Sequence, residues 1–193
     1  DGWGFETHFD RVVCVCRYAG IVKDALKRYK FSNRPSYFRT LAALLADKVS
    51  QVTRGQKFDI IISVPLHRKR QGVRGYNQSL LISRQLCRLL KVRERSELLE
   101  RIKNTESQSL LDRHQRLMNI KEAFRVTNAR EVMGKTILLV DDILTTGSTL
   151  NECSMVLKRA GAQMVVAAVV ASGRSTFRNG RCEKSGRADG RCR

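Results

Sequence analysis

The sequence predicts an α/β fold, a three-layer sandwich with a mainly parallel central sheet. Residues 59–64 and 136–140 are almost continuously apolar, as strands buried on both faces of a parallel sheet are. Segments with helical spacing of apolar residues lie between the expected strands, which is the pattern of right-handed crossovers. A length of 193 residues with 42% hydrophobic residues fits one compact domain.

The first third of the chain predicts one strand and two helices. Residues 11–18 (RVVCVCRY) are short, β-branched and apolar, which favours a strand. Pro35 separates two amphipathic helices, the second of which should end near Gly55. Their apolar residues recur at helical spacing: Val22, Ala25, Leu26 and Tyr29 in the first, and Leu41, Leu44, Leu45 and Val49 in the second.

The middle of the chain contains a buried strand and a basic loop. Pro65 stops the strand at residues 59–64, and the loop LHRKRQGVRGYNQ follows at residues 66–78. Residues 91–123 are polar and only weakly periodic, so we expect a mobile stretch, and residues 124–126 predict a short strand. The helix before that stretch has its apolar face at Ile82, Leu86, Leu89 and Leu90.

The last part predicts a strand at residues 136–140, a helix from about residue 149 to 159 and a strand at 164–171. From Gly173 onward Gly, Arg and Ser dominate without a hydrophobic period. We therefore expect a folded domain at residues 1–173 and a disordered basic tail at 174–193. Nucleic-acid binding by the tail and an incidental extension are both open.

The charge and the cysteines limit the function classes. A net charge of +19 favours anionic partners such as phosphates, nucleotides or nucleic acid, but a solvated surface that resists aggregation explains it equally well. The six cysteines form no C-x-x-C pair, and no apolar run approaches the roughly 20 residues of a membrane helix. We expect no membrane span and a reducing, cytoplasmic location.

Residues 137–149 (ILLVDDILTTGST) carry the clearest functional pattern. Asp141 and Asp142 should end the strand at the carboxyl edge of the sheet, where open α/β folds bind ligands. Their carboxylates can accept hydrogen bonds from ribose hydroxyls or hold Mg²⁺ through water. The hydroxyls, the glycine and the N–H groups of the following helix start form a cradle for a monophosphate.

Two features of this pattern also fit a turn that binds no ligand. Thr149 and Glu152 have the spacing of a capping box, and many α/β proteins have an Asp and a Ser/Thr cap between a strand and a helix. The complete run of a strand, two acids, two residues and T-T-G-S-T is much more restrictive, so we favour the ligand site.

These residues resemble the phosphoribosylpyrophosphate motif of type I phosphoribosyltransferases. The resemblance implies that Asp141 and Asp142 are the catalytic carboxylates, hold the ribose and carry Mg²⁺ through water. Hypoxanthine–guanine enzymes of this class have an Asp at the position of Thr145, so its absence argues against that substrate. The implied phosphoribosyl-binding loop comprises Leu144, Thr145, Thr146, Gly147, Ser148 and Thr149.

A second motif, VPLHRKRQGVRGYNQ, follows the strand that ends at Val64. Its basic residues can neutralise a pyrophosphate, although His67 is equally well explained as a solvated or structural histidine. The resulting pyrophosphate-binding candidates are Leu66, His67, Arg68, Lys69 and Arg70.

Together with the phosphoribosyl motif, VPLHRKRQGVRGYNQ and the later QSLLDRHQRLMNIKEAF resemble the ComF family. This family comprises phosphoribosyltransferase-like proteins linked to competence and DNA uptake, and the resemblance spans about residues 11–172. Many members carry an N-terminal four-cysteine zinc module that has no counterpart in this sequence, so we do not expect zinc. The resemblance implies a mobile loop over the site, with candidates Arg74, Asn77, Gln78, Gln108, Arg113, Arg116 and Asn119.

The leading hypothesis is a Mg²⁺-dependent, phosphoribosyltransferase-like protein that binds 5-phosphoribosyl-1-pyrophosphate. If it catalyses transfer of the phosphoribosyl group, it belongs to the glycosyltransferase class, and its acceptor is unidentified. The alternative is a single-stranded-DNA-binding adaptor of the uptake machinery with little or no transferase activity. Its partners would include a competence helicase, and a homodimer is open for either hypothesis. A regulator that senses nucleotides through the same pocket is a third class.

Overall fold

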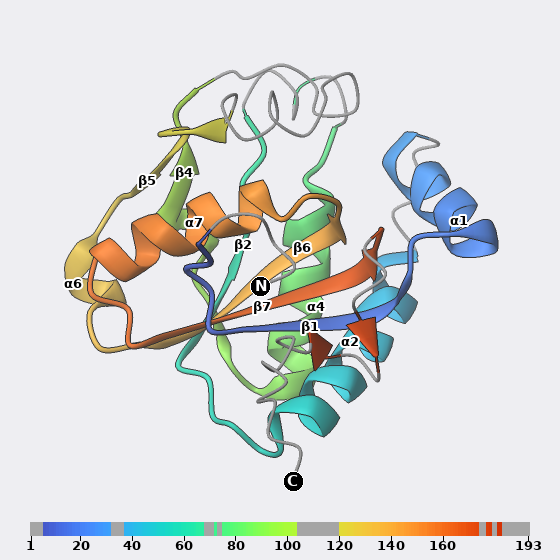
Figure 1. Ribbon diagram of the computed structural model, residues 1–193, viewed down its shortest axis with the longest axis horizontal. Coiled ribbons are helices and arrows are strands. Elements are labelled where there is room, and N and C mark those ends of the chain that lie inside the picture. The colour runs from blue at the N-terminus through green and yellow to red at the C-terminus, as the bar shows by residue number, and fades with distance from the viewer. Residues whose placement is uncertain are drawn as a thin grey trace, which may run out of the picture.

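A mainly parallel sheet forms the centre of the computed structural model, which describes residues 6–31, 37–67, 72, 75–103, 120–173, 177–178 and 181–182 (Figure 1). This sheet confirms the predicted fold class. Its strand order is β3-β2-β6-β7-β1-β9-β8, and the first five strands pair in parallel. Those five are β3 (Arg93–Glu94), β2 (Ile60–Ser63), β6 (Thr136–Leu144), β7 (Met164–Ser172) and β1 (Arg11–Arg17).

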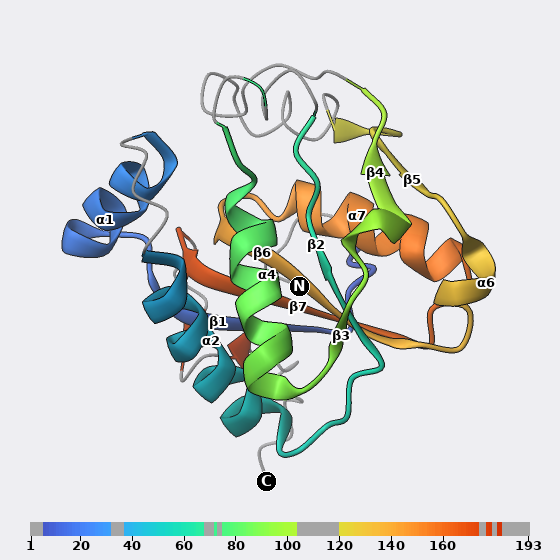
Figure 2. The same cartoon turned by 180° about the vertical axis from the view of Figure 1, so that it is seen from behind.

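Helices cover the two faces of the sheet and make the three layers. Figure 1 shows α7 (Ser148–Arg159) in front of the sheet, and Figure 2 shows α2 (Tyr37–Thr53) and α4 (Gln78–Leu90) on the opposite face. On that second face α1 (Gly20–Phe31) contributes Leu26 to the same core as α2 and α4.

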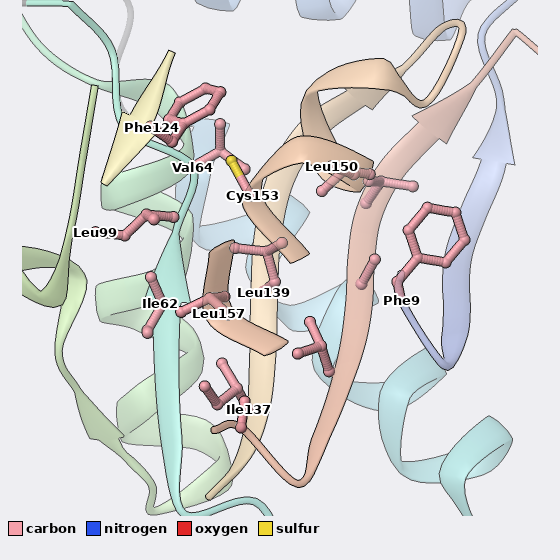
Figure 3. Packing of buried hydrophobic residues seen from close by; sticks show 14 of the residues in the cluster. Phe9, Ile62, Val64, Leu99, Phe124, Ile137, Leu139, Leu150, Cys153 and Leu157 are labelled. Atoms are coloured by element: carbon pink, nitrogen blue, oxygen red, sulfur yellow. The ribbon is translucent and has the colours of Figure 1, made fainter. Parts of the chain in front are cut away.

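The apolar strands are buried on both sides because their side chains alternate between two cores. In β6, Ile137 and Leu139 face the core under α7, whereas Leu138 and Val140 face the core under α2 and α4. Figure 3 shows the first of these cores, in which Leu139 lies close to α7. This double burial explains why the strand has no polar alternation before Asp141.

Two leucines of the predicted helical faces are exposed. Leu44 of α2 is 48% exposed and Leu89 of α4 is 45% exposed, whereas Leu45 and Leu86 are fully buried. The small side chains of Ala42 and Ala46 take part in the buried stripe of α2. The buried face of α2 is thus centred away from Leu44. The spacing of apolar residues alone did not predict this shift.

The stretch at residues 91–123 is more structured than expected where the structure describes it. It contains β3, a 3₁₀ helix at Ser96–Leu98 and β4 (Leu99–Arg101), whereas residues 104–119 lie outside the described residues. The short strand predicted at residues 124–126 is present as β5 (Phe124–Val126). It pairs antiparallel with β4 in a separate two-stranded sheet, followed by the short helix α6 (Ala129–Val132).

The tail contributes two short strands. β8 (Phe177–Arg178) and β9 (Arg181–Cys182) pair with each other, and β9 pairs antiparallel with β1. We expected these four residues to be disordered, but they form strands, because the outer edge of β1 offers backbone groups for pairing. The rest of residues 174–193 lies outside the described residues, so the domain division at residue 173 stays a prediction.

Within the described part of the chain, every helix is too short or too polar to cross a membrane.

Candidate functional site

Strand β6 extends four residues further than predicted and carries both aspartates within it. Asp141 lies in register with Val169 of β7, and pairing continues to Leu144 opposite Ser172. The expectation that the aspartates end the strand is therefore wrong, because β7 is long enough to pair with β6 through residue 144. The aspartates still lie in the carboxyl-terminal half of a parallel strand, at the edge where such sheets bind ligands.

Strict alternation of side chains does not hold at the two aspartates, because Val140 and Ile143 on either side of them both pack in the core under α2 and α4. The Oδ1 of Asp141 accepts a hydrogen bond of 2.8 Å from the hydroxyl of Ser79 in α4. The same oxygen accepts a hydrogen bond of 2.9 Å from the backbone N–H of Asp142. Asp142 is only 7% exposed. Asp141 is thus tied to α4 through Ser79, whereas Asp142 is almost fully buried.

Ser79 is a site residue that the sequence analysis missed. It lies in the first turn of α4, is 4% exposed and holds Asp141 in one orientation through the 2.8 Å hydrogen bond. A serine at the start of a helix has many structural explanations, and its partner is 62 residues away along the chain. Only the packing of α4 against β6 brings the two together.

Asn77 and Gln78 lie at the start of α4 rather than in a loop over the site. Asn77 is the N-cap, with Oδ1 accepting from the N–H of Ser79 at 3.0 Å and Nδ2 donating to the carbonyl of Val64 at 3.1 Å. The two residues are 7% and 2% exposed. An Asn directly before a helical apolar pattern is an N-cap signal, which could have corrected the mobile-loop expectation.

The segment after β6 forms a tight, hydroxyl-rich turn. The hydroxyls of Thr146 and Ser148 lie 2.8 Å apart, and both residues are buried with Gly147. Thr145 is exposed and Thr149 is half-buried. The turn begins at the buried Leu144, whose carbonyl accepts a hydrogen bond of 2.9 Å from the N–H of Gly173.

Gly147 is the N-cap of α7, with φ +90°, and makes no side-chain capping bond. The expected capping box is therefore absent: Thr149 lies inside the helix, and Glu152 instead accepts a 2.6 Å hydrogen bond from the backbone N–H of Glu122. Helix N-termini attract anions through exposed N–H groups and the helix dipole, and a glycine lets an anion approach the backbone closely.

The strand β2 brings the second motif to the same edge of the sheet. The N–H of Val64 donates to the carbonyl of Val140 at 2.8 Å, directly before Asp141. Leu66 and His67 follow and are half-buried. Arg68, Lys69, Arg70, Arg74, Gln108, Arg113, Arg116 and Asn119 lie outside the described residues.

Cys14 and Cys153 are buried in the core, whereas Cys16 and Cys87 are partly buried. Burial raises the pKa of Cys14 to about 12, and burial also raises the pKa of Cys153 on α7. Both thiols are therefore protonated at neutral pH, which disfavours a role as nucleophile or thiolate ligand. Among the residues with described positions, no group of three or more His, Cys, Asp or Glu side chains could hold a metal ion.

A family model described as the phosphoribosyl transferase domain matches residues 33–184, which include the acids, the hydroxyl-rich turn and both motifs. The chain belongs to this family. As a phosphoribosyl transferase domain protein, it has relatives named for competence and DNA utilization. It is 37% identical over 164 residues to "Competence protein F" of Haemophilus influenzae, covering 83% of this chain and 72% of the relative.

Further relatives agree with this placement. "DNA utilization protein YhgH" of Escherichia coli O6:H1 is 38% identical over 160 residues, covering 81% of this chain and 70% of the relative. "Competence protein ComFC" of Bacillus subtilis is 28% identical over 152 residues, covering 76% and 58% of the two chains. Within the phosphoribosyl transferase domain family, the chain is therefore a member of the ComF competence and DNA utilization group, as its motifs predicted.

Solved structures support the fold of this phosphoribosyl transferase domain. A structure described as the allosteric regulatory enzyme of purine biosynthesis superposes with a TM-score of 0.50 at 17% identity. The match covers 74% of this chain and 29% of that one. At this identity the similarity concerns the fold alone.

Proposed function

We propose that this ComF-family chain binds 5-phosphoribosyl-1-pyrophosphate through the edge formed by the ends of β2 and β6 and the start of α7. The observation that carries the proposal is the N-terminus of α7, where Gly147 supplies no side-chain cap and adopts φ +90°. A 5′-phosphate at this position would accept hydrogen bonds from the backbone of the first turn and from the hydroxyls of Thr146 and Ser148.

The two aspartates supply what the sugar needs. A ribose presents neighbouring hydroxyls, which donate well to ionised carboxylates. Asp141 is held by Ser79 and by the N–H of Asp142 through one oxygen, so its orientation is set before the sugar arrives. Such pre-organisation reduces the entropy lost on binding.

The two carboxylates fit Mg²⁺ as ligands that act through the water molecules around the ion. The carboxylates of Asp141 and Asp142 are hard oxygen donors of the kind that Mg²⁺ prefers, and this ion usually keeps several waters and binds substrate phosphates. These side chains would hold the ion through water. When bound, Mg²⁺ would neutralise charge on the pyrophosphate.

The transfer reaction requires the bond between C1 of the ribose and the pyrophosphate oxygen to break, with the electron pair leaving on pyrophosphate. Positive charge develops on the ribose, and the acceptor then forms the new bond to C1. The proposed role of Asp141 and Asp142 is to hold the ribose while this charge develops. Arg68, Lys69 and Arg70 would neutralise the leaving group. Pyrophosphate release on addition of candidate acceptors would distinguish an enzyme from a sensor that only binds.

Titration calorimetry with 5-phosphoribosyl-1-pyrophosphate and Mg²⁺ tests the binding step. We expect Asp141→Asn to lower the affinity about tenfold, because a charged hydrogen-bond acceptor to the ribose is lost. The control is Asp47→Asn on the exposed side of α2, which should bind as the wild type does. The proposal fails if the wild-type protein with Mg²⁺ binds no ligand, or if Asp141→Asn and Asp47→Asn bind equally well.

A second candidate function is binding of single-stranded DNA, which the net charge of +19 favours. Phosphate contacts by Lys and Arg release counterions, so the logarithm of the affinity should fall linearly with the logarithm of the salt concentration. Fluorescence anisotropy with a labelled oligonucleotide checks this dependence, and affinity that does not change with salt would contradict it. The competence helicase partner, the homodimer and the cytoplasmic location remain predictions.

A further inference from the structure

The segment of residues 6–10, which we call the N-terminal strap, runs beside the first turn of α7. Asn151 holds it with both ends of its side-chain amide. Its Oδ1 accepts a hydrogen bond of 2.7 Å from the N–H of His8, and its Nδ2 donates one of 2.9 Å to the carbonyl of Glu6. The amide therefore binds the backbone on either side of Thr7, as a neighbouring β-strand would.

The strap is also anchored at its other end. Phe9 is 7% exposed and packs into the core under α7, on the side of β1 and β7 (Figure 3). Asp10 donates its N–H to the carbonyl of Val165 at 2.9 Å and accepts the N–H of Val165 on Oδ2 at 2.7 Å. The same Oδ2 lies 2.7 Å from Nζ of Lys158 near the end of α7. The strap thus spans α7 from its first turn toward its last.

Asn151 also connects directly to the turn after β6. Its backbone N–H donates to the carbonyl of Gly147 at 2.9 Å, which closes the first turn of α7. One residue therefore contacts the strap through its side chain and the N-cap of α7 through its backbone. A change in the position of the strap can therefore reach the first turn of α7 through Asn151.

We propose that Asn151 is a positioning residue that couples the strap to the anion-binding turn. The coupling to a phosphorylated ligand rests on the proposed function. A docked strap restricts α7's first turn and so lowers the ordering cost of anion binding. By linkage, an anion bound at the turn stabilises the docked strap to the same extent. Asn151 itself touches no ligand in this arrangement.

Amide hydrogen exchange of Asn151→Ala tests the coupling without any ligand. The control is Asn128→Ala, because Asn128 also uses its side chain as one acceptor, from Arg130 N–H, and one donor, to Glu131, but caps the distant helix α6. We expect Asn151→Ala to raise exchange in residues 6–10 and 147–151 about tenfold, since two hydrogen bonds are lost. Strand β2 serves as internal reference and should not change, because the last turn of α7 is itself linked to the strap through Lys158.

The ligand-bound measurement then tests the linkage. Mg²⁺ with 5-phosphoribosyl-1-pyrophosphate should slow exchange in the strap of the wild type and of Asn128→Ala, and Asn151→Ala should bind about fivefold more weakly. If the wild type binds no ligand, the proposed function fails, and the ligand-free exchange alone decides whether strap and turn are joined. Unchanged exchange at residues 147–151 in Asn151→Ala overturns the proposal. So does a bound ligand that leaves the wild-type strap unaffected.

Discussion

Gly147→Ala is expected to lower the affinity for Mg²⁺ and 5-phosphoribosyl-1-pyrophosphate about 100-fold while the protein remains folded. Gly147 has φ +90° and is buried at the N-cap of α7, where the proposed 5′-phosphate approaches the backbone. A Cβ atom would strain this conformation and occupy space next to the anion, so that the N–H donors no longer converge. Losing two charge-assisted hydrogen bonds, each worth about 1.5 kcal/mol, gives this magnitude.

The matched control is Gly134→Ala. Gly134 has φ +71°, and a Cβ atom built there would meet nothing within 4 Å. Both variants should lose about 1 kcal/mol of unfolding free energy from backbone strain, but only Gly147→Ala should lose ligand affinity. Calorimetry and urea denaturation of both proteins separate the two effects. Equal affinities in the two variants would contradict the placement of the phosphate at α7.

Leu139→Ala is expected to cause the largest loss of stability, about 3 kcal/mol of unfolding free energy. Leu139 is fully buried in the middle of β6 and packs in the core under α7, where truncation leaves a cavity (Figure 3). Its neighbours come from strands and a helix, so the site cannot easily collapse.

Leu89→Ala is the control for this prediction, because it removes the same atoms from an exposed position. Leu89 is 45% exposed on α4. We expect it to cost less than about 1 kcal/mol. Urea denaturation monitored by circular dichroism measures both values. Similar losses for the two variants would mean that the buried face of α4 or β6 is not as described.

The parts of the fold that the sequence predicted well are those with strong local periodicity. The apolar runs at β2, β6 and β7 can be recognised because burial on both faces removes polar residues. Helices α2 and α4 followed from their apolar spacing, but the same spacing also placed Leu44 and Leu89 inside, although both are exposed. The spacing of apolar residues predicts that a helix is present. Which of those residues are buried depends on how the helix is rotated about its axis against the sheet and the neighbouring helices.

The candidate site was predicted in part for the same reason. Asp141, Asp142 and the turn through Thr149 are contiguous, so one motif identified them together. Ser79 was missed because its relation to Asp141 depends on how α4 crosses β6. The mobile-loop expectation for Asn77 came from the family resemblance, whereas the structure makes it a cap tied to Val64.

The sequence by itself determined the alternation of strands and helices, the family and the residues of the hydroxyl-rich turn, because each is written in short contiguous patterns. Tertiary structure alone decided that both aspartates lie within β6, that Ser79 orients one of them and that Asn151 holds the strap at His8. The last contact joins residues 143 positions apart. Such contacts depend on strand register and on helix packing, which local propensity does not specify.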